Sequence, residues 1–219
     1  MYRIADVLPD AELDAIREAL ADPSLFEDGR LTAGWSAKGV KNNLQLALSP
    51  LERGLVEKVE KALLAHPVFQ AAAIPKTLIR TRLSRYEHGM TYGWHIDDPL
   101  IERERTDLAF TLFLSDPSTY EGGALLIDAS DGESEIKLPA GQVFLYPATT
   151  LHQVEPVTSG VRLAAFGWVR SYVRRADQRE ILFDLDLACR KIFAEQGKSP
   201  FFDSMSKTKA NLMRLWIED

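Results

Sequence analysis

The chain lacks the features of a disulfide-stabilised, thiolate-ligating or membrane-spanning protein. Among its 219 residues there is one cysteine, Cys189, which excludes an intrachain disulfide and a thiolate metal cluster. No stretch approaches the roughly 18 consecutive apolar residues that cross a bilayer, and the first residues lack the apolar core of a signal peptide. We therefore expect a cytoplasmic protein without a membrane partner, in which Cys189 is a small buried apolar residue.

An excess of positive charge is also missing. Lysine and arginine number 26 against 32 aspartates and glutamates, which leaves a formal net charge of −6. This balance gives no electrostatic footprint for nucleic acid, so we expect no nucleic-acid partner. The hydrophobic fraction of 46% and the charged fraction of 26% are ordinary for a globular protein. The length suits one large domain with a small appendage.

Helical patterns lie towards the two ends of the chain. Apolar residues at helical spacing predict helices over residues 11–20, 51–64, 176–197 and 202–216. We therefore expect one domain over 1–175 and a C-terminal helical extension over 176–219. The last helix carries an apolar group, Leu212, Leu215, Trp216 and Ile217. This group favours docking of the helix on the core over contact with a second copy, so both a monomer and a homodimer stay open.

Between the helical ends, the apolar period shortens towards two. Strands are predicted over residues 78–86, 107–115, 124–127, 142–146 and 161–169. In the first strand, Ile79, Thr81 and Leu83 alternate with polar residues, which predicts one solvent-exposed face. Turn signals such as Glu121-Gly122-Gly123 separate the strands. Many short strands with regular turns predict a mainly β fold with flanking helices, either a sandwich or a barrel, jelly rolls included.

His95 and Asp97 form the pair with the clearest chemical meaning. On a β-strand, residues i and i+2 project from the same face, so these two side chains can bind one metal ion together. His152, from a distant segment, would complete a set of two histidines and one carboxylate. Such a set leaves coordination positions open and is typical of non-haem Fe(II) oxygenases. A hydrogen-bonded core histidine is the alternative for each imidazole alone, and we interpret His66 and His88 as non-ligands.

Arg162 follows His152 in an apolar strand. It shares one predicted face with Ala164, Phe166 and Trp168. An arginine in such a strand needs an anionic partner, either in a structural ion pair or in a bound carboxylate. An iron centre with one carboxylate ligand would accept 2-oxoglutarate as a chelator, and Arg162 would bind its far carboxylate. The hydroxyl of Tyr86 is within reach of the same carboxylate, and Thr111 is a further candidate contact.

Taken together, the motifs resemble those of a known enzyme family. The stretch from Tyr86 to Asp97, YEHGMTYGWHID, resembles the YxxGxxYxxHxD signature of prolyl/lysyl hydroxylase-type Fe(II)/2-oxoglutarate dioxygenases. The segments Glu121-Gly-Gly-Ala-Leu and His152 to Arg162 fit the same family. The bacterial branch, the PKHD-type hydroxylases, is also similar in Lys41-Asn-Asn-Leu-Gln45 and in the C-terminal helices. The resemblance extends over essentially the whole chain.

The resemblance implies a double-stranded β-helix (jelly-roll) core and an iron centre. Fe(II) would be held by His95, Asp97 and His152, and Arg162 would anchor 2-oxoglutarate. The implied reaction consumes O2 and 2-oxoglutarate, releases succinate and CO2, and hydroxylates an unactivated C–H bond. Ascorbate commonly sustains such enzymes. Substrate contacts from the polar segment that holds Asn43 and Gln45 are a further expectation.

Related activities are distinguished by single positions. Halogenases of the superfamily replace the carboxylate ligand with a small residue, so Asp97 argues against halogenation. Nucleic-acid demethylases carry a second arginine six residues after the first, where this chain has Trp168. Two readings of another kind stay open, a non-catalytic metal-binding jelly-roll module and a cupin-like metalloenzyme with another co-substrate. The sequence leaves both a peptidyl residue and a small metabolite open as substrate.

Overall fold

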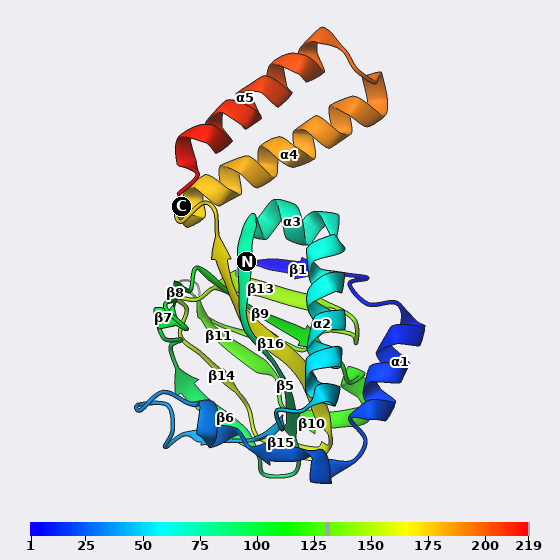
Figure 1. Ribbon diagram of the computed structural model, residues 1–219, viewed down its shortest axis with the longest axis vertical. Coiled ribbons are helices and arrows are strands. Elements are labelled where there is room, and N and C mark those ends of the chain that lie inside the picture. Colours follow the sequence, from blue (N-terminus) through cyan, green and yellow to red (C-terminus); the bar gives the residue numbers. More distant parts are fainter. Residues whose placement is uncertain (130–131, 219) are drawn as a thin grey trace.

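Two antiparallel sheets stack face to face in the computed structural model, which describes residues 1–129 and 132–218 (Figure 1). The larger sheet has the order β1 (Tyr2–Ile4), β13 (Val143–Pro147), β9 (Leu108–Phe113), β16 (Arg162–Ser171), β5 (Pro75–Tyr86), β4 (Leu44–Leu46) and β2 (Phe26–Asp28). The smaller sheet has the order β12 (Gly132–Ile136), β11 (Leu125–Ala129), β14 (His152–Val154), β6 (Thr91–His95) and β3 (Lys41–Asn42). Two further short antiparallel pairs lie outside these sheets. One is the hairpin of β7 (Leu100–Ile101) and β8 (Glu104–Arg105), and the other joins β10 (Tyr120–Gly122) to the distant β15 (Val157–Gly160). The predicted mainly β jelly-roll class is confirmed.

Helices cover the outer face of the larger sheet. These are α1 (Asp10–Ala19), α2 (Pro50–Ala65) and α3 (Pro67–Ala73), and short 3-10 turns lie at Pro23–Leu25, Gly29–Thr32 and Pro117–Thr119. At the start of α2, the Ser49 hydroxyl accepts a hydrogen bond from the Glu52 backbone N–H at 3.1 Å, as expected for an N-cap residue. Leu55, Val59 and Leu63 then face the core from one side of the helix.

The strand predicted over residues 107–115 is β9, and its side chains alternate between two apolar clusters. On β9, Leu108, Phe110 and Leu112 pack into the apolar cluster beneath the helices. Ala109 and Phe113 face the opposite way, into a second cluster between the two sheets. Because neither face of such a strand is exposed to water, its sequence is a nearly continuous run of apolar residues.

The predicted exposed face of strand 78–86 is wrong. Arg82 and Ser84 are buried, at 6% and 2% exposure, because this face of β5 lines a cavity between the sheets while the other meets the helices. The alternation also breaks at a β-bulge: Arg80 has φ of 47°, and the pairing with β16 shifts between Phe166 and Trp168. A bulge inserts an extra residue and re-aims the side chains that follow it.

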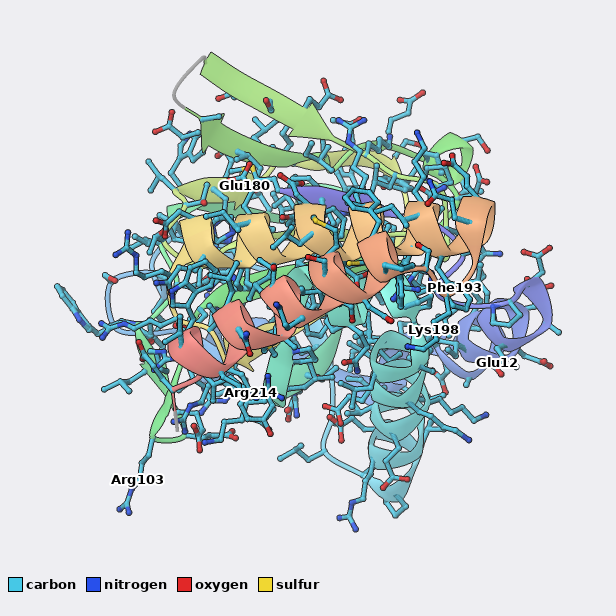
Figure 2. The ribbon with its side chains drawn as sticks, turned by 90° about the horizontal axis from the view of Figure 1, so that it is seen from above. Glu12, Arg103, Glu180, Phe193, Lys198 and Arg214 are labelled. Carbon is cyan, nitrogen blue, oxygen red and sulfur yellow. The ribbon has the colours of Figure 1, made fainter. Side chains whose placement is uncertain are left out.

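The chain ends in a helical hairpin, α4 (Ala176–Gln196) and α5 (Pro200–Trp216), that projects from one end of the sandwich (Figure 1). Seen from above, the two helices lie side by side, with Phe193 near the loop that joins them (Figure 2). Leu212 and Trp216 pack on a small cluster formed by Ile74, Val173 and Leu182. This contact agrees with the predicted docking, although Leu215 is 75% exposed.

Two other expectations concern the same region. Cys189 is buried in α4 and makes no disulfide, as predicted. Within residues 1–129 and 132–218, no helix is long and apolar enough to cross a membrane. The division into a domain over 1–175 and an extension over 176–219 stays a prediction.

Leu63 offers a direct test of the packing of α2 on the sheet. Its side chain is fully buried in the larger core cluster, whereas its neighbour Leu64 is 42% exposed. Leu63→Ala is expected to lower the free energy of unfolding by about 2–5 kcal/mol, since the lost contacts leave a cavity. Leu64→Ala, the matched control, should change it by no more than about 0.5 kcal/mol. Denaturant titration of both variants measures the difference, and equal losses would contradict this packing.

Candidate active site

His95, Asp97 and His152 converge at the mouth of the space between the sheets. His95 ends β6 and is paired in register with His152, which begins β14. Each of the three residues offers a ligand atom that lies within 4.8 Å of the others, and Asp97 Oδ1 is 4.0 Å from His152 Nε2. One expectation needs correction: β6 stops at His95, so Asp97 lies just beyond the strand and not on it.

Backbone carbonyls orient both imidazoles. His95 Nδ1 lies 2.8 Å from the Gly93 carbonyl oxygen, and His152 Nδ1 lies 2.9 Å from that of Thr150. Since a carbonyl only accepts, each Nδ1 carries the proton, and each Nε2 is left with a free lone pair. This tautomer is the one in which a histidine binds a metal through Nε2.

Burial shifts the pKa of two of these groups, His95 and Asp97. It lowers the pKa of His95 to about 3, and the neighbouring His152 acts in the same direction. Burial also raises the pKa of Asp97, against the opposing effects of His152 and of the Trp168 indole N–H. Asp97 Oδ2 is buried without a hydrogen-bond partner among the described residues. Two imidazoles that each present a free Nε2 lone pair, beside a carboxylate that lacks a hydrogen-bond partner at Oδ2 among the described residues, form a donor set that a divalent cation would satisfy.

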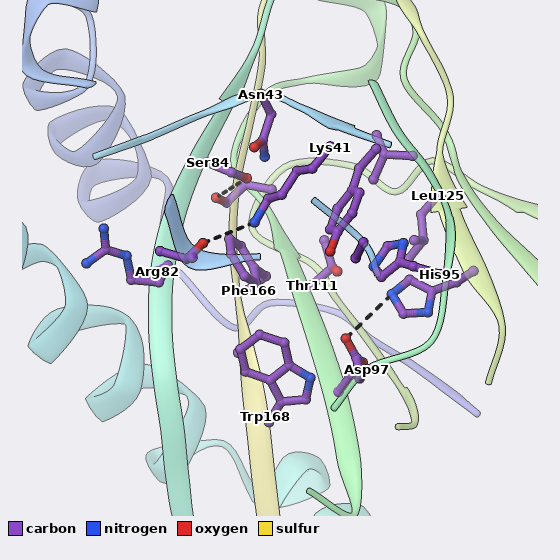
Figure 3. A pocket seen from close by; sticks show the side chains of 18 of the residues that line it. Lys41, Asn43, Arg82, Ser84, His95, Asp97, Thr111, Leu125, Phe166 and Trp168 are labelled. Atoms are coloured by element: carbon purple, nitrogen blue, oxygen red, sulfur yellow. Dashed lines mark hydrogen bonds and ion pairs between the residues drawn. The ribbon is translucent and has the colours of Figure 1, made fainter. Parts of the chain in front are cut away.

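Trp168 faces Asp97 across the site (Figure 3), where its indole N–H favours the charged carboxylate and has no other hydrogen-bond partner among the described residues. We expect Trp168→Phe to weaken metal affinity by roughly 10- to 100-fold, because partners of a ligating group that fix its orientation have effects of that size. Titration of the purified variant with Mn(II) measures the change. Phe166→Leu, on the same strand, is the control, and equal metal affinity in Trp168→Phe and wild type would contradict this role.

Beside these three residues lies a cavity of about 970 Å³, counted with its open mouth. Arg162, Ala164, Phe166 and Trp168 all line it from β16, as the alternation predicted. Arg162 is 2% exposed, and in the described part of the chain no carboxylate lies within 4.0 Å of it. Its guanidinium carbon lies 5.2 Å from the centre of the Tyr86 ring and 5.3 Å from that of Phe113. A buried cation without a protein counterion is a strong anchor for a ligand carboxylate.

Two further features shape the arginine end of the cavity. Gly123 has φ of 63°, and a Cβ there would lie 3.1 Å from Arg162 Cδ, so the glycine of the turn Glu121-Gly122-Gly123 leaves room for the arginine. Tyr86 lines the cavity, and burial raises its pKa, opposed by the charge of Arg162 and by Asn43. Tyr86 therefore keeps a neutral hydroxyl, and its ring lies beside the guanidinium.

The remaining sequence-predicted residues divide into two groups. Asn43 and Thr111 line the cavity, and both amide atoms of Asn43 are buried without a hydrogen-bond partner among the described residues. Gln45 is fully buried behind the cavity wall, where its Oε1 accepts a hydrogen bond from Thr32 at 2.8 Å. His66 lies at the junction of α2 and α3, and His88 contacts the Thr158 carbonyl, so neither joins the three converging residues.

Sequence reasoning missed several residues of the cavity, among them Lys41 and Tyr146. Lys41 lines it and is buried at 5% exposure, and Tyr146 lies beside His152 with ring centres 5.2 Å apart. Tyr146 belongs to a strand that the pattern did identify, but its facing depends on the pairing of β13 with β9. Lys41 belongs to a two-residue strand with no periodic signal, so only its pairing with β6 brings it to the site.

Comparisons with known proteins agree with this geometry. Residues 81–170 match the family model described as the 2OG-Fe(II) oxygenase superfamily. A PKHD-type hydroxylase of Picosynechococcus sp. is 49% identical over 218 residues, which cover 99% of each protein. A PKHD-type hydroxylase of Maricaulis maris is 50% identical over the full length of both chains. Among solved structures, a Pseudomonas putida prolyl-4-hydroxylase shares the fold, with a TM-score of 0.57 at 19% identity over 78% of this chain and 91% of that one.

Proposed function

The chain belongs to the PKHD-type hydroxylases of the 2OG-Fe(II) oxygenase superfamily, and from this premise we propose how its own residues serve that chemistry. The enzyme is a 2-oxoglutarate-dependent dioxygenase that uses Fe(II). His95, Asp97 and His152 would hold the iron on one face. The observation that carries this assignment is the convergence of their three ligand atoms within 4.8 Å.

The donor set fits Fe(II) in charge and in geometry. Two neutral imidazoles and one carboxylate leave a net positive centre with open positions, which can take 2-oxoglutarate and O2. When bound, the iron would supply the oxidising chemistry by which O2 and 2-oxoglutarate give succinate and CO2, while the second oxygen atom is inserted into a C–H bond of the substrate. The protein's part is to present three ligands and to shape the cavity beside them.

The co-substrate would lie between the iron and Arg162. Its far carboxylate would accept two hydrogen bonds from the guanidinium, whose planar fork matches a carboxylate. The Tyr86 hydroxyl would donate to the same group. The absence of a protein counterion within 4.0 Å of Arg162 among the described residues supports this assignment.

The substrate would enter from the open mouth and be either a peptidyl residue or a small metabolite. Asn43, with its unpartnered amide, would contact it, and Gln45 would act through Thr32. Because the chain is acidic, we infer that it has no nucleic-acid partner. We also propose a cytoplasmic location and either a monomer or a homodimer. Ascorbate would sustain turnover by keeping the iron reduced.

Succinate production tests the proposed chemistry. Purified protein given Fe(II), 2-oxoglutarate, O2 and ascorbate is expected to release succinate slowly even without its primary substrate. Removal of the metal with a chelator should stop the reaction, and added Fe(II) should restore it. Tight iron binding without any succinate would instead support a non-catalytic metal-binding module.

A further inference from the structure

Lys41 is a buried cation in the cavity that neither the iron centre nor the co-substrate anchor uses. Its Nζ donates a hydrogen bond to Thr32 Oγ1 at 3.1 Å. In the described part of the chain, no carboxylate lies within 4.0 Å of this amine. Burial lowers the pKa of Lys41 to about 8, and the charge of Arg82 acts in the same direction. The amine therefore stays largely protonated at neutral pH.

The other cations of this wall are already paired. Arg82 lies 3.3 Å from Glu52, donates to the Leu46 carbonyl at 3.0 Å, and also approaches a second carboxylate. Arg80 forms an ion pair with Glu102 at 3.0 Å. Lys41 differs from both because, among the described residues, its hydrogen-bond partner is a neutral hydroxyl, that of Thr32. A buried charge of this kind is costly unless a ligand compensates it.

The position of Lys41 is fixed relative to the iron ligands. Thr32, which accepts from the amine, is itself held by Gln45 at 2.8 Å. The amine lies 4.9 Å from the centre of the Tyr92 ring and 5.9 Å from that of Phe166. Tyr92 in turn stacks on His95, with ring centres 3.6 Å apart. Figure 3 shows Lys41 extending over Phe166, with His95 and Asp97 on the other side of the cavity.

We propose that Lys41 binds a carboxylate group of the primary substrate, while Tyr92 and Phe166 pack against the apolar part next to that group. The proposal rests on the proposed function, since it treats the cavity beside the iron as the substrate site. Two acidic residues act on the charge of Lys41 from a distance, Asp28 and Asp97. Asp28 is paired with Arg30, and Asp97 belongs to the proposed iron centre. An anionic substrate therefore meets a free positive charge here, one aromatic ring away from a metal ligand.

A pair of matched probes tests this assignment without knowledge of the natural substrate. The protein is loaded with Mn(II) and saturating 2-oxoglutarate, so that Arg162 is occupied, and is then titrated with benzoate or with the neutral benzamide. Relaxation enhancement of the ring protons by Mn(II) reports binding near the metal. Lys41→Met, Lys41→Arg and the exposed control Lys38→Met are compared with wild type. The visible charge-transfer band of each variant with Fe(II) and 2-oxoglutarate, recorded without oxygen, reports the iron centre separately.

We expect saturable enhancement for benzoate in wild type, at an affinity about tenfold tighter than for benzamide, as a charge-assisted hydrogen bond predicts. Lys41→Met should lose this preference, while Lys41→Arg and Lys38→Met should keep it. Equal affinity of wild type for benzamide and benzoate, or binding of neither, would contradict the assignment. A preference for benzoate that persists in Lys41→Met would contradict it too. Absence of the charge-transfer band in wild type would instead contradict the proposed iron and co-substrate chemistry.

Discussion

Replacement of Asp97 by alanine is expected to abolish succinate production and leave the fold intact. Asp97 supplies the only carboxylate among the three converging ligand residues. Loss of a residue that merely orients a ligand reduces metal affinity or activity by 10- to 100-fold, so loss of the ligand itself should exceed about 100-fold. The metal-free protein should not be destabilised, because burial already raises the pKa of this carboxyl and its charge is unfavourable there.

Two measurements separate these effects. Succinate released from 2-oxoglutarate reports turnover, and the melting temperature with and without Mn(II) reports metal binding, since a ligand that binds only the folded state stabilises it. We expect Asp97→Ala to lose both turnover and the metal-dependent shift. Asp128→Ala, which removes an exposed carboxylate from β11, should keep both. Normal turnover in Asp97→Ala would show that the iron is held elsewhere.

Replacement of Arg162 by methionine is expected to weaken 2-oxoglutarate binding more than any other change in the co-substrate pocket. The guanidinium is buried, and among the described residues it has no carboxylate partner of its own. Truncating one partner of a buried, hydrogen-bonded charge pair costs about 2–5 kcal/mol, which corresponds to a loss of roughly 30-fold or more in affinity. The metal site should remain, because Arg162 is not among the three residues whose ligand atoms converge.

Calorimetric titration of the Mn(II)-loaded protein with 2-oxoglutarate measures this loss. Arg162→Lys should recover part of the affinity, since lysine keeps the charge but not the planar fork. Arg53→Met, on the exposed side of α2, is the control for loss of a surface charge. Unchanged 2-oxoglutarate affinity in Arg162→Met, with metal binding intact, would mean that another cation anchors the co-substrate.

The sequence predicts the parts of the fold that follow from local periodicity. The two faces of β9 and the cavity-lining face of β16 emerge as expected, because each strand keeps strict alternation along the residues that matter. The helices also begin and end close to the predicted residues, since Ser49 and Ser199 act as N-caps and Pro50 and Pro200 follow them.

What the sequence could not predict depends on tertiary packing. The exposed face expected on β5 is buried by contacts from elsewhere in the chain, and the bulge at Arg80 breaks its alternation. Strand β6 ends at His95 because its pairing with the neighbouring strands β14 and β3 does not extend to Asp97. Lys41 reaches the cavity only through its pairing with Tyr92. No pattern within the residues around Lys41 carries that information.

The most direct test of the iron and co-substrate assignment is an anaerobic titration of the wild-type protein with Fe(II) and 2-oxoglutarate. Chelation of 2-oxoglutarate by iron in this ligand set gives a visible metal-to-ligand charge-transfer band. We expect the band to appear at one iron per chain and to be absent in Asp97→Ala under the same conditions. Iron binding without any band in wild type would contradict the assignment, because the co-substrate would then not reach the metal held by His95, Asp97 and His152.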